Sequence, residues 1–258
     1  MKRLVGLIPA AGLGTRLGLT GSKELAPVAA SEGTGEAGGP LERRPVATTL
    51  LDALGAARIE TAYVVLRTGK WDVPEGLGDR GDAMPRLAYI VTEPTRSIPE
   101  TLNRARRFVL GAQVMLGFPD VVFSPRDAVL ELLAARERLT TDVVLALFPS
   151  ERPDKTDMVQ LDGDRVTGFR IKPGPCVLEY TWILATWGDA FTEFLSAFLG
   201  RTGGEPPAGS VLPELQISQV LDAALEEGLT IGACPLPQGR FIDVGTPDDL
   251  ARAREGAL

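Results

Sequence analysis

Small residues and two cations near the N-terminus have the composition of a phosphate-binding site. They follow an apolar run, residues 4–10, and occupy one stretch of the chain: Ala11, Gly12, Gly14, Thr15, Arg16 and Lys23. Backbone approaches a ligand closely where side chains are small, and successive N–H groups of such a loop bind anionic oxygens. Arg16 adds a planar fork of donors and Lys23 a compact point charge. The stretch therefore predicts a cradle for phosphate groups.

The absence of histidine narrows the chemistry that this chain can perform. The 258 residues contain no histidine, which excludes nucleophilic catalysis by a Ser-His or Cys-His pair and most transition-metal sites. Cys176 and Cys234 lie far apart, so a zinc or redox motif of the C-x-x-C type is not expected. Carboxylates, Arg, Lys and a hard metal ion remain. Phosphoryl and nucleotidyl transfer need only these groups, because positioning and charge neutralisation account for most of the catalysis.

Strands and helices alternate through the first 150 residues. The apolar patterns predict strands at 4–10, 62–66, 87–91, 113–123 and 142–148, and helices at 45–54, 99–110 and 128–139. Asp120 stands where the fourth apolar run breaks, and ligands gather at the carboxyl ends of strands in open α/β sheets. The alternation predicts an α/β fold with a Rossmann-like, doubly wound, mostly parallel sheet.

From residue 150 the pattern changes, which predicts a smaller β-rich half inserted into this fold. A hairpin is expected at 158–171, turned on Asp162-Gly163-Asp164. Further strands are expected at 178–186, 230–235 and 241–247, and helices at 189–199, 213–227 and 248–255. Loops are expected at 69–85 and 29–40, and the second is either a lid over the site or an inert connection.

The opening stretch also resembles the signature of a known family. Ala-Ala-Gly-Leu-Gly-Thr-Arg (10–16), six residues and then Lys-Glu-Leu-Ala-Pro-Val (23–28) resembles the signature of the sugar-phosphate nucleotidylyltransferases. Three further stretches match the same family: Gly-Phe-Pro-Asp (117–120), Lys-Pro (172–173) and Asp-Val-Gly-Thr-Pro (243–247). The pattern is most similar to the glucose-1-phosphate thymidylyltransferases and the UTP–glucose-1-phosphate uridylyltransferases. The resemblance spans nearly the whole chain.

The resemblance implies one domain, with a nucleotide-binding half at 1–150 and a sugar-phosphate-binding half at 151–258 that returns Asp243 to the metal site. In such enzymes two aspartates at the positions of Asp120 and Asp243 hold Mg²⁺ against the nucleotide phosphates. This agrees with the preference of Mg²⁺ for one or two carboxylates with waters and phosphate oxygens. The glycine loop, residues 11–15, would cradle the triphosphate. Arg16 would stabilise charge on the leaving pyrophosphate, and Lys23 would orient the α-phosphate. Lys172 would hold the incoming sugar phosphate.

The sequence departs from the family pattern in two places. Ile171 replaces the glutamate that usually precedes the lysine of Lys-Pro and binds a sugar hydroxyl, so the sugar stays open. Residues 93–101 replace a Gln-Pro followed by a Gly-Leu-Ala or Gly-Thr-Ala element; here Glu93 and Ser97 are predicted to contact the nucleotide. Trp182 lies near the expected sugar pocket and is either a ligand wall or a core residue. We expect dTTP or UTP as the nucleotide, with guanylyl or cytidylyl transfer as the alternative.

The charge of the chain limits its partners. A formal net charge of −7 at pH 7 argues against nucleic acids and anionic membranes, both of which favour a basic face. No apolar run reaches the length of a transmembrane helix, and Met1-Lys2-Arg3 leads directly into a strand. We therefore expect a cytoplasmic protein that binds a nucleoside triphosphate and a sugar 1-phosphate, and homo-oligomerisation stays open.

Two other functions stay open. In an NADP-dependent oxidoreductase, Arg67 at the end of the second strand would contact a 2′-phosphate, but that function leaves Lys23 and Asp243 unexplained. A non-catalytic sensor of the same fold would bind a nucleotide sugar, and Ile171 and the altered residues 93–101 favour it. Binding of NADPH would identify the first alternative, and release of pyrophosphate would exclude the second.

Overall fold

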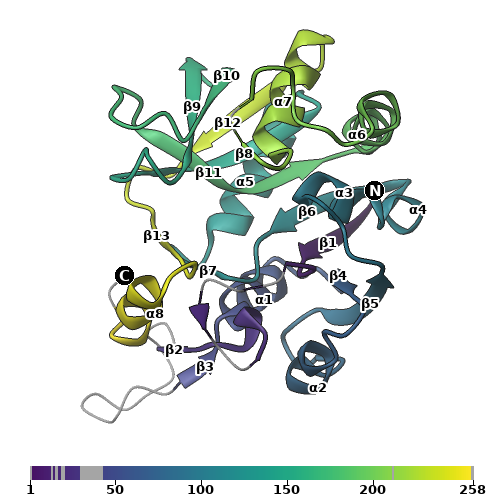
Figure 1. The fold of residues 1–258 in the computed structure, drawn as a ribbon, viewed down its shortest axis with the longest axis vertical. Helices are drawn as coiled ribbons and strands as arrows, with labels where there is room; N and C mark the ends of the chain where they lie inside the picture. The colour runs from purple at the N-terminus through teal and green to yellow at the C-terminus, as the bar shows by residue number, and fades with distance from the viewer. Residues whose placement is uncertain are drawn as a thin grey trace.

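The computed structural model describes residues 2–12, 14, 17–18, 21–29, 43–210 and 212–256. Thr15, Arg16 and residues 30–40 of the expected loop lie outside this set. The described chain forms one nine-stranded sheet and two small two-stranded sheets. The large sheet has the strand order β5-β4-β1-β6-β11-β8-β12-β10-β9, and it runs through the middle of the molecule (Figure 1).

The N-terminal part of the large sheet is parallel, as predicted. Its strands are β1 (Arg3–Pro9), β4 (Thr61–Arg67), β5 (Arg86–Thr92) and β6 (Ala112–Gly117). Every neighbouring pair among them is parallel. β1 lies between β4 and β6 and is buried at residues 5–8, which explains its continuous apolar run. Parallel strands end at the same edge, so the loop after β1 lies on the same edge as the ends of β4 and β5.

The C-terminal part of the same sheet is mixed, so the prediction of a mostly parallel, doubly wound sheet is wrong here. Its strands are β8 (Val143–Pro149), β9 (Asp157–Asp162), β10 (Arg165–Ile171), β11 (Tyr180–Trp187) and β12 (Ile231–Pro235). β11 runs antiparallel to both β6 and β8, and β9 pairs with β10 and β11. With the pairs β8–β12 and β10–β12, these strands close into a small barrel-like ring. Antiparallel neighbours need no crossover helix, so the order of elements along the chain did not reveal them.

A two-stranded sheet brings the end of the chain back to the middle of the molecule. The strand predicted at 113–123 is divided, because β6 ends at Gly117 and β7 (Val121–Ser124) begins after Asp120. β7 pairs antiparallel with β13 (Arg240–Asp243), and α8 (Pro247–Arg254) follows. β13 runs from the mixed strands toward α8 (Figure 1). The second small sheet, β2 (Pro27–Ala29) with β3 (Arg43–Pro45), lies against α8. No pattern in the sequence predicted this sheet.

The remaining helices match most of the predictions. α1 (Ala47–Ala56), α5 (Ala128–Arg138), α6 (Asp189–Thr202) and α7 (Ile217–Glu226) lie where helices were expected. The helix predicted at 99–110 is divided into α3 (Ile98–Asn103) and α4 (Arg106–Val109). The loop predicted at 69–85 contains a short helix, α2 (Asp72–Leu77). α7 begins four residues later than predicted, where the Gln219 side chain accepts a hydrogen bond from the Gln216 backbone N–H at 2.9 Å.

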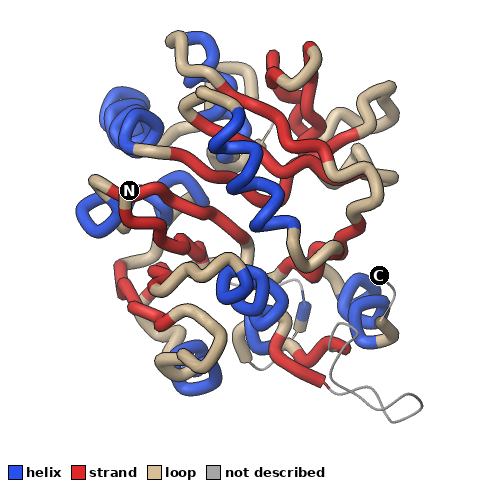
Figure 2. The backbone as a smooth tube through the Cα atoms, turned by 180° about the vertical axis from the view of Figure 1, so that it is seen from behind, coloured by secondary structure: helices blue, strands red, loops and turns tan. Residues whose placement is uncertain are grey.

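Helices cover both faces of the sheet, and each face has its own apolar core. One core joins the sheet to α3, α4, α6 and α7, and the other joins it to α1, α2 and α5. Figure 2 shows the molecule from behind, with helices in front of the strands. The architecture is therefore an α/β fold with a mixed sheet. Among the described residues, no helix has both the length and the apolar character needed to cross a membrane.

Candidate functional site

Of the loop after β1, the structure describes Ala11, Gly12 and Gly14, and Gly14 lies near Lys23. The Ala10 N–H donates to the Val65 carbonyl at 2.9 Å, which continues the pairing of β1 with β4 beyond the strand. Gly14 has a φ of +65°, in the left-handed region that favours glycine. A Cβ at Gly14 would lie 3.8 Å from the Cβ of Lys23. Ala11 is buried and Gly12 is exposed. The roles assigned to Thr15 and Arg16 stay predictions, because both residues lie outside the described set.

Lys23 and Asp120, predicted from separate stretches, form an ion pair. The pair is largely enclosed, with 23% of the Lys23 side chain and 12% of the Asp120 side chain exposed. Burial disfavours the ammonium charge. The negative charges of Asp120, Glu24 and Asp243 outweigh that effect, so the pKa of Lys23 lies above its usual value. Lys23 therefore carries a fixed positive charge beside the glycine loop.

The pairing of β7 with β13 places Asp243 beside Asp120. Asp243 lies opposite Val121 in this ladder, and the Val244 N–H donates to the Asp120 carbonyl at 2.9 Å. Asp243 is also close enough to raise the pKa of Lys23. Two carboxylates from distant parts of the chain thus act on one ammonium group, Asp120 as its ion-pair partner and Asp243 through its charge.

This donor set fits Mg²⁺, a hard ion that takes oxygen ligands. Within the described part of the chain, no group of three or more His, Cys, Asp and Glu residues has the arrangement of a metal site. A Mg²⁺ ion held by Asp120 and Asp243 would therefore take its other ligands from phosphate oxygens and water, as this ion commonly does.

A cavity of about 230 Å³ opens beside Asp243, between β13, α8 and residues 149–156. Its charged lining includes Arg152, Arg240 and Arg252 together with Asp249. Arg152 pairs with Asp249 at 2.9 Å, which joins residues 149–156 to α8. Asp243 itself is exposed. It is therefore accessible from the cavity that it lines.

Sequence reasoning missed a buried ion pair directly beneath the glycine loop. Lys70 and Glu24 are 4% and 1% exposed, and the Lys70 Nζ lies 2.7 Å from both Glu24 carboxylate oxygens. The same Nζ donates to the Gly12 carbonyl at 3.3 Å. Burial raises the pKa of Glu24, and the charge of Lys70 opposes that rise. The pair joins the glycine loop to η2 (Lys23–Leu25), the turn that carries Lys23.

The unpredicted helix α2 also holds this turn. Asp72, its first residue, accepts hydrogen bonds from the Ser22 N–H at 2.6 Å and the Ser22 hydroxyl at 2.8 Å. A Cβ at Gly76 would lie 2.8 Å from Leu25, so the helix packs directly on η2. The glycines and prolines of 69–85 favoured a loop. The acidic residues of the first turn, Asp72 and Glu75, were the signal for a helix.

Glu93 and Ser97 follow β5, at the edge of the sheet that carries the glycine loop. Glu93 is exposed. Ser97 is buried, and its hydroxyl accepts a hydrogen bond from the Glu100 N–H at 3.4 Å, as the N-terminal cap of α3. The Ser97 side chain is thus engaged with its own helix. Contacts of either residue with a nucleotide stay predictions.

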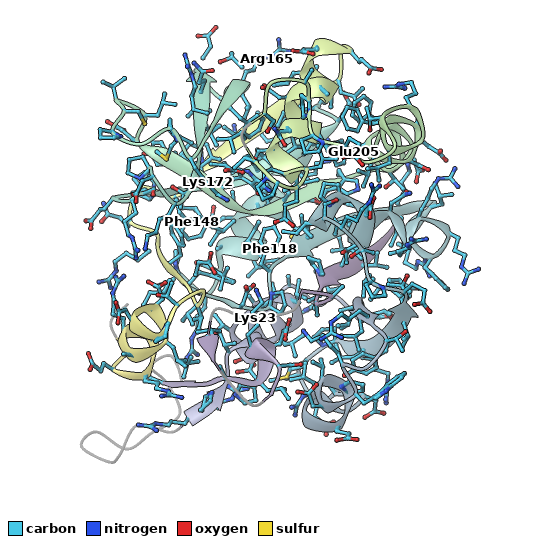
Figure 3. All side chains as sticks on the ribbon, viewed as in Figure 1. Lys23, Phe118, Phe148, Arg165, Lys172 and Glu205 are labelled. Carbon is cyan, nitrogen blue, oxygen red and sulfur yellow. The ribbon has the colours of Figure 1, made fainter. Side chains whose placement is uncertain are left out.

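Lys172 and Trp182 belong to the mixed part of the sheet. Figure 3 labels Lys172 on that part and Lys23 on the other, with Phe118 labelled between them. Lys172 is exposed, directly after β10. Trp182 is 6% exposed and donates its indole N–H to the Ser218 hydroxyl at 2.9 Å. Its ring lies against Phe118 at 5.8 Å between centroids. Trp182 is thus part of the core, and its predicted contact with a sugar stays a prediction.

Three solved structures are similar to this chain over almost its whole length. The first is described as a glucose-1-phosphate thymidylyltransferase from Bacillus anthracis, in complex with sucrose (TM-score 0.75, 19% identity, 98% of this chain and 94% of that one). The second is the UTP-bound UGPase from Acinetobacter baumannii (TM-score 0.74, 16% identity, 100% of this chain and 93% of that one). The third is the inositol-1-phosphate CTP transferase from T. maritima (TM-score 0.68, 14% identity, 99% of this chain and 97% of that one).

The sequence itself matches no protein-family model and no curated protein. The likeness is therefore one of structure at low sequence identity. It extends over both the parallel and the mixed parts of the sheet, since nearly all of each chain is covered. The chain has the fold of the sugar-phosphate nucleotidylyltransferases.

Proposed function

We propose that this protein transfers a nucleotidyl group from a nucleoside triphosphate to a sugar 1-phosphate and releases pyrophosphate. The observation that carries the proposal is the convergence of Lys23, Asp120 and Asp243 beside the glycine loop. One cation and two carboxylates at a phosphate cradle suit a reaction that needs positioning and charge neutralisation. We favour dTTP or UTP as the nucleotide and glucose 1-phosphate as the acceptor.

The proposed mechanism is an in-line displacement. A phosphate oxygen of the sugar 1-phosphate attacks the α-phosphorus, and the bond from the α-phosphorus to the bridging oxygen of the pyrophosphate breaks. The sugar phosphate is already ionised at neutral pH, so no general base is required. Gly12 and Gly14 hold the triphosphate through backbone N–H groups, and Lys23 orients the α-phosphate. Lys172 binds the phosphate of the sugar.

Asp120 and Asp243 would hold Mg²⁺, which neutralises charge on the phosphates when it is bound. Lys23 already balances Asp120 in the structure. The ammonium and the metal ion are therefore expected to share the two carboxylates once a triphosphate supplies further negative charge.

The names of the three similar structures support nucleotidyl transfer as the reaction class. They refer to thymidylyl transfer, UTP and CTP, so they differ in the base. Which base this protein binds therefore depends on its own residues, and the three names do not decide it. Release of pyrophosphate that requires both a sugar 1-phosphate and Mg²⁺ tests the proposal. Binding of a nucleotide sugar without such release would identify a non-catalytic sensor.

Replacement of Arg16 is expected to lower turnover more than it lowers affinity for the triphosphate, because charge on the pyrophosphate grows toward the transition state. Loss of a hydrogen bond to a charged group costs about 1.5–3 kcal/mol, or about tenfold to a hundredfold in kcat for Arg16→Ala. Arg16→Lys should recover part of this loss, because the charge returns without the planar fork. Weakened triphosphate binding with normal kcat would show that Arg16 serves binding alone.

Glu93→Gln is expected to change the preference among bases if Glu93 contacts the base. An ionised carboxylate only accepts hydrogen bonds, whereas a Gln amide matches the N–H and carbonyl of thymine or uracil. A mispaired buried polar group costs about 1–3 kcal/mol, so the preference for dTTP or UTP should rise about tenfold or more. All triphosphates are competed in one assay with the parent and the variant. An unchanged ranking would show that Glu93 does not contact the base.

A further inference from the structure

Three arginines line the cavity of about 230 Å³, which we call the arginine cavity. Arg152 comes from the loop between β8 and β9, Arg240 is the first residue of β13, and Arg252 belongs to α8. Arg252 lies three residues after Asp249, and residues at this spacing share one face of a helix. Arg152 pairs with Asp249 at 2.9 Å. Arg252 therefore lies on the face of α8 at which the Arg152 guanidinium is bound.

The charge of Asp249 is committed to Arg152. Asp249 is buried, and its Oδ1 accepts a hydrogen bond from the Arg152 guanidinium at 2.9 Å. Its Oδ2 accepts a hydrogen bond from the Thr246 hydroxyl at 2.6 Å, beside the N-terminal cap that Thr246 forms on α8. Each oxygen of this carboxylate thus has a partner within the protein, and the charge of Arg252 is not neutralised by it.

The lining of the arginine cavity carries more positive than negative charge. It holds four cationic side chains, the three arginines and Lys155, against three carboxylates. The side chains of Arg240 and Arg252 form no ion pair with any residue that the structure describes. The whole chain has a formal net charge of −7, so this excess is local. A hollow lined by one sign of charge concentrates ions of the opposite sign.

Hydrogen bonds hold the wall of the cavity that carries Arg152. The Ser150 N–H donates to the Glu179 carbonyl at 2.9 Å, and the Ser150 hydroxyl lies 2.8 Å from the Thr156 hydroxyl. The Thr156 hydroxyl in turn donates to the Arg152 carbonyl at 3.1 Å. These bonds and the pair with Asp249 place Arg152 before any ligand binds. A group placed in advance loses less entropy on binding than a mobile surface side chain.

A phosphate group is the anion that suits this lining. Guanidinium groups bind phosphate oxygens through two parallel hydrogen bonds. The cavity is smaller than the pockets of about 300–1,000 Å³ that bind drug-sized ligands, so it favours a small anion over a nucleotide. No described residue of the glycine loop lines it, and neither Lys23 nor Lys172 does so. The arginine cavity is thus separate from the groups expected to bind the substrate phosphates.

We propose that the arginine cavity is a further anion-binding site, in which Arg240 and Arg252, with Arg152 beside them, bind a phosphate group of a small anion other than the nucleoside triphosphate. Asp243 also lines the cavity, so the bound anion lies next to the proposed reaction centre. Inorganic phosphate and the phosphate of a sugar share this chemistry, and the experiment distinguishes them. The site does not depend on nucleotidyl transfer.

The test is calorimetric titration of inorganic phosphate into the parent and into Arg240→Gln and Arg252→Gln. Each variant removes one guanidinium that donates to the anion, so the affinity for phosphate should fall about tenfold or more. Arg165→Gln is the matched control, because Arg165 is an exposed arginine of β10 outside the cavity. It should bind phosphate as the parent does. Lys172→Met should also keep the parent's affinity.

Arg240 and Arg252 are exposed, so both variants should fold, which chemical denaturation checks. Glucose 1-phosphate is then titrated into the parent saturated with phosphate. We expect it to bind without displacing phosphate, as a site for a separate anion requires. Displacement would support the site and assign it to the phosphate of the sugar.

An unchanged affinity for phosphate in both folded arginine variants would overturn the inference. A loss of phosphate binding in Lys172→Met, with none in the arginine variants, would also overturn it. A folded parent that binds phosphate in this way but forms no nucleotide sugar would contradict only the proposed function. The two failures are therefore distinguishable.

Discussion

Replacing Asp120 or Asp243 by asparagine is expected to reduce Mg²⁺-dependent turnover by about a hundredfold or more, or about 3 kcal/mol of transition-state stabilisation. Each substitution removes a ligand charge while it preserves the shape of the side chain. Asp120 directly precedes β7 and Asp243 is the last residue of β13, and both act on one ammonium group. Initial rates measured over a range of Mg²⁺ concentrations should show lower maximal rates and a requirement for more metal.

Asp162→Asn is the control for this prediction, because it removes the same charge from an exposed position at the end of β9. It should leave the rate and the Mg²⁺ dependence unchanged. If Asp120→Asn or Asp243→Asn kept near-parental activity with an unchanged Mg²⁺ requirement, that aspartate would have a structural role and the site would be wrong.

Lys70→Met is expected to lower the free energy of unfolding by about 3–5 kcal/mol, because it leaves the Glu24 carboxylate buried without its partner. Glu24 is 1% exposed and receives two contacts from Lys70 at 2.7 Å. Chemical denaturation of the parent and the variant measures the loss. Arg86→Met is the control, because the Arg86–Asp79 pair is exposed and such pairs contribute at most about 1 kcal/mol.

The double variant Glu24→Leu with Lys70→Met separates stability from function. Replacing both charges by apolar side chains of similar size is often neutral for stability, so most of the lost unfolding free energy should return. In both the single and the double variant the Gly12 carbonyl lacks its donor, so we expect kcat to be lower than that of the parent in both. Recovery of kcat together with stability would show that the pair supports the fold and does not position the glycine loop. Near-parental stability of Lys70→Met would contradict the burial of the pair.

The local elements of the fold could be predicted because their patterns lie within short stretches of sequence. The apolar run of β1 and the helical spacing of α1 are examples. The position of β11 could not be predicted in this way. A strand with this apolar pattern can join the sheet either parallel, through a crossover connection, or antiparallel beside β6. The sequence pattern is the same in both cases. The barrel-like ring depends on the pairing of β9 with β11, which is a contact between strands that are not consecutive.

The candidate site shows the same limit. The glycine loop and Lys23 share one stretch, so their proximity was predictable from sequence. The proximity of Asp120 and Asp243 was expected only through the family resemblance, since the two residues are 123 positions apart in the sequence (243 − 120). Lys70 carried no signal, because a lone lysine in a polar stretch is usually exposed and its partner Glu24 lies 46 residues away.

The most direct test of the proposed function is to identify the product formed from each nucleoside triphosphate with each of several sugar 1-phosphates in the presence of Mg²⁺. Mass spectrometry detects the nucleotide sugar, and a coupled assay detects pyrophosphate. We predict equal amounts of the two products for at least one pairing, with dTTP or UTP as the nucleotide, and almost none with Asp120→Asn. A folded parent that forms neither product in any pairing would contradict the proposed function.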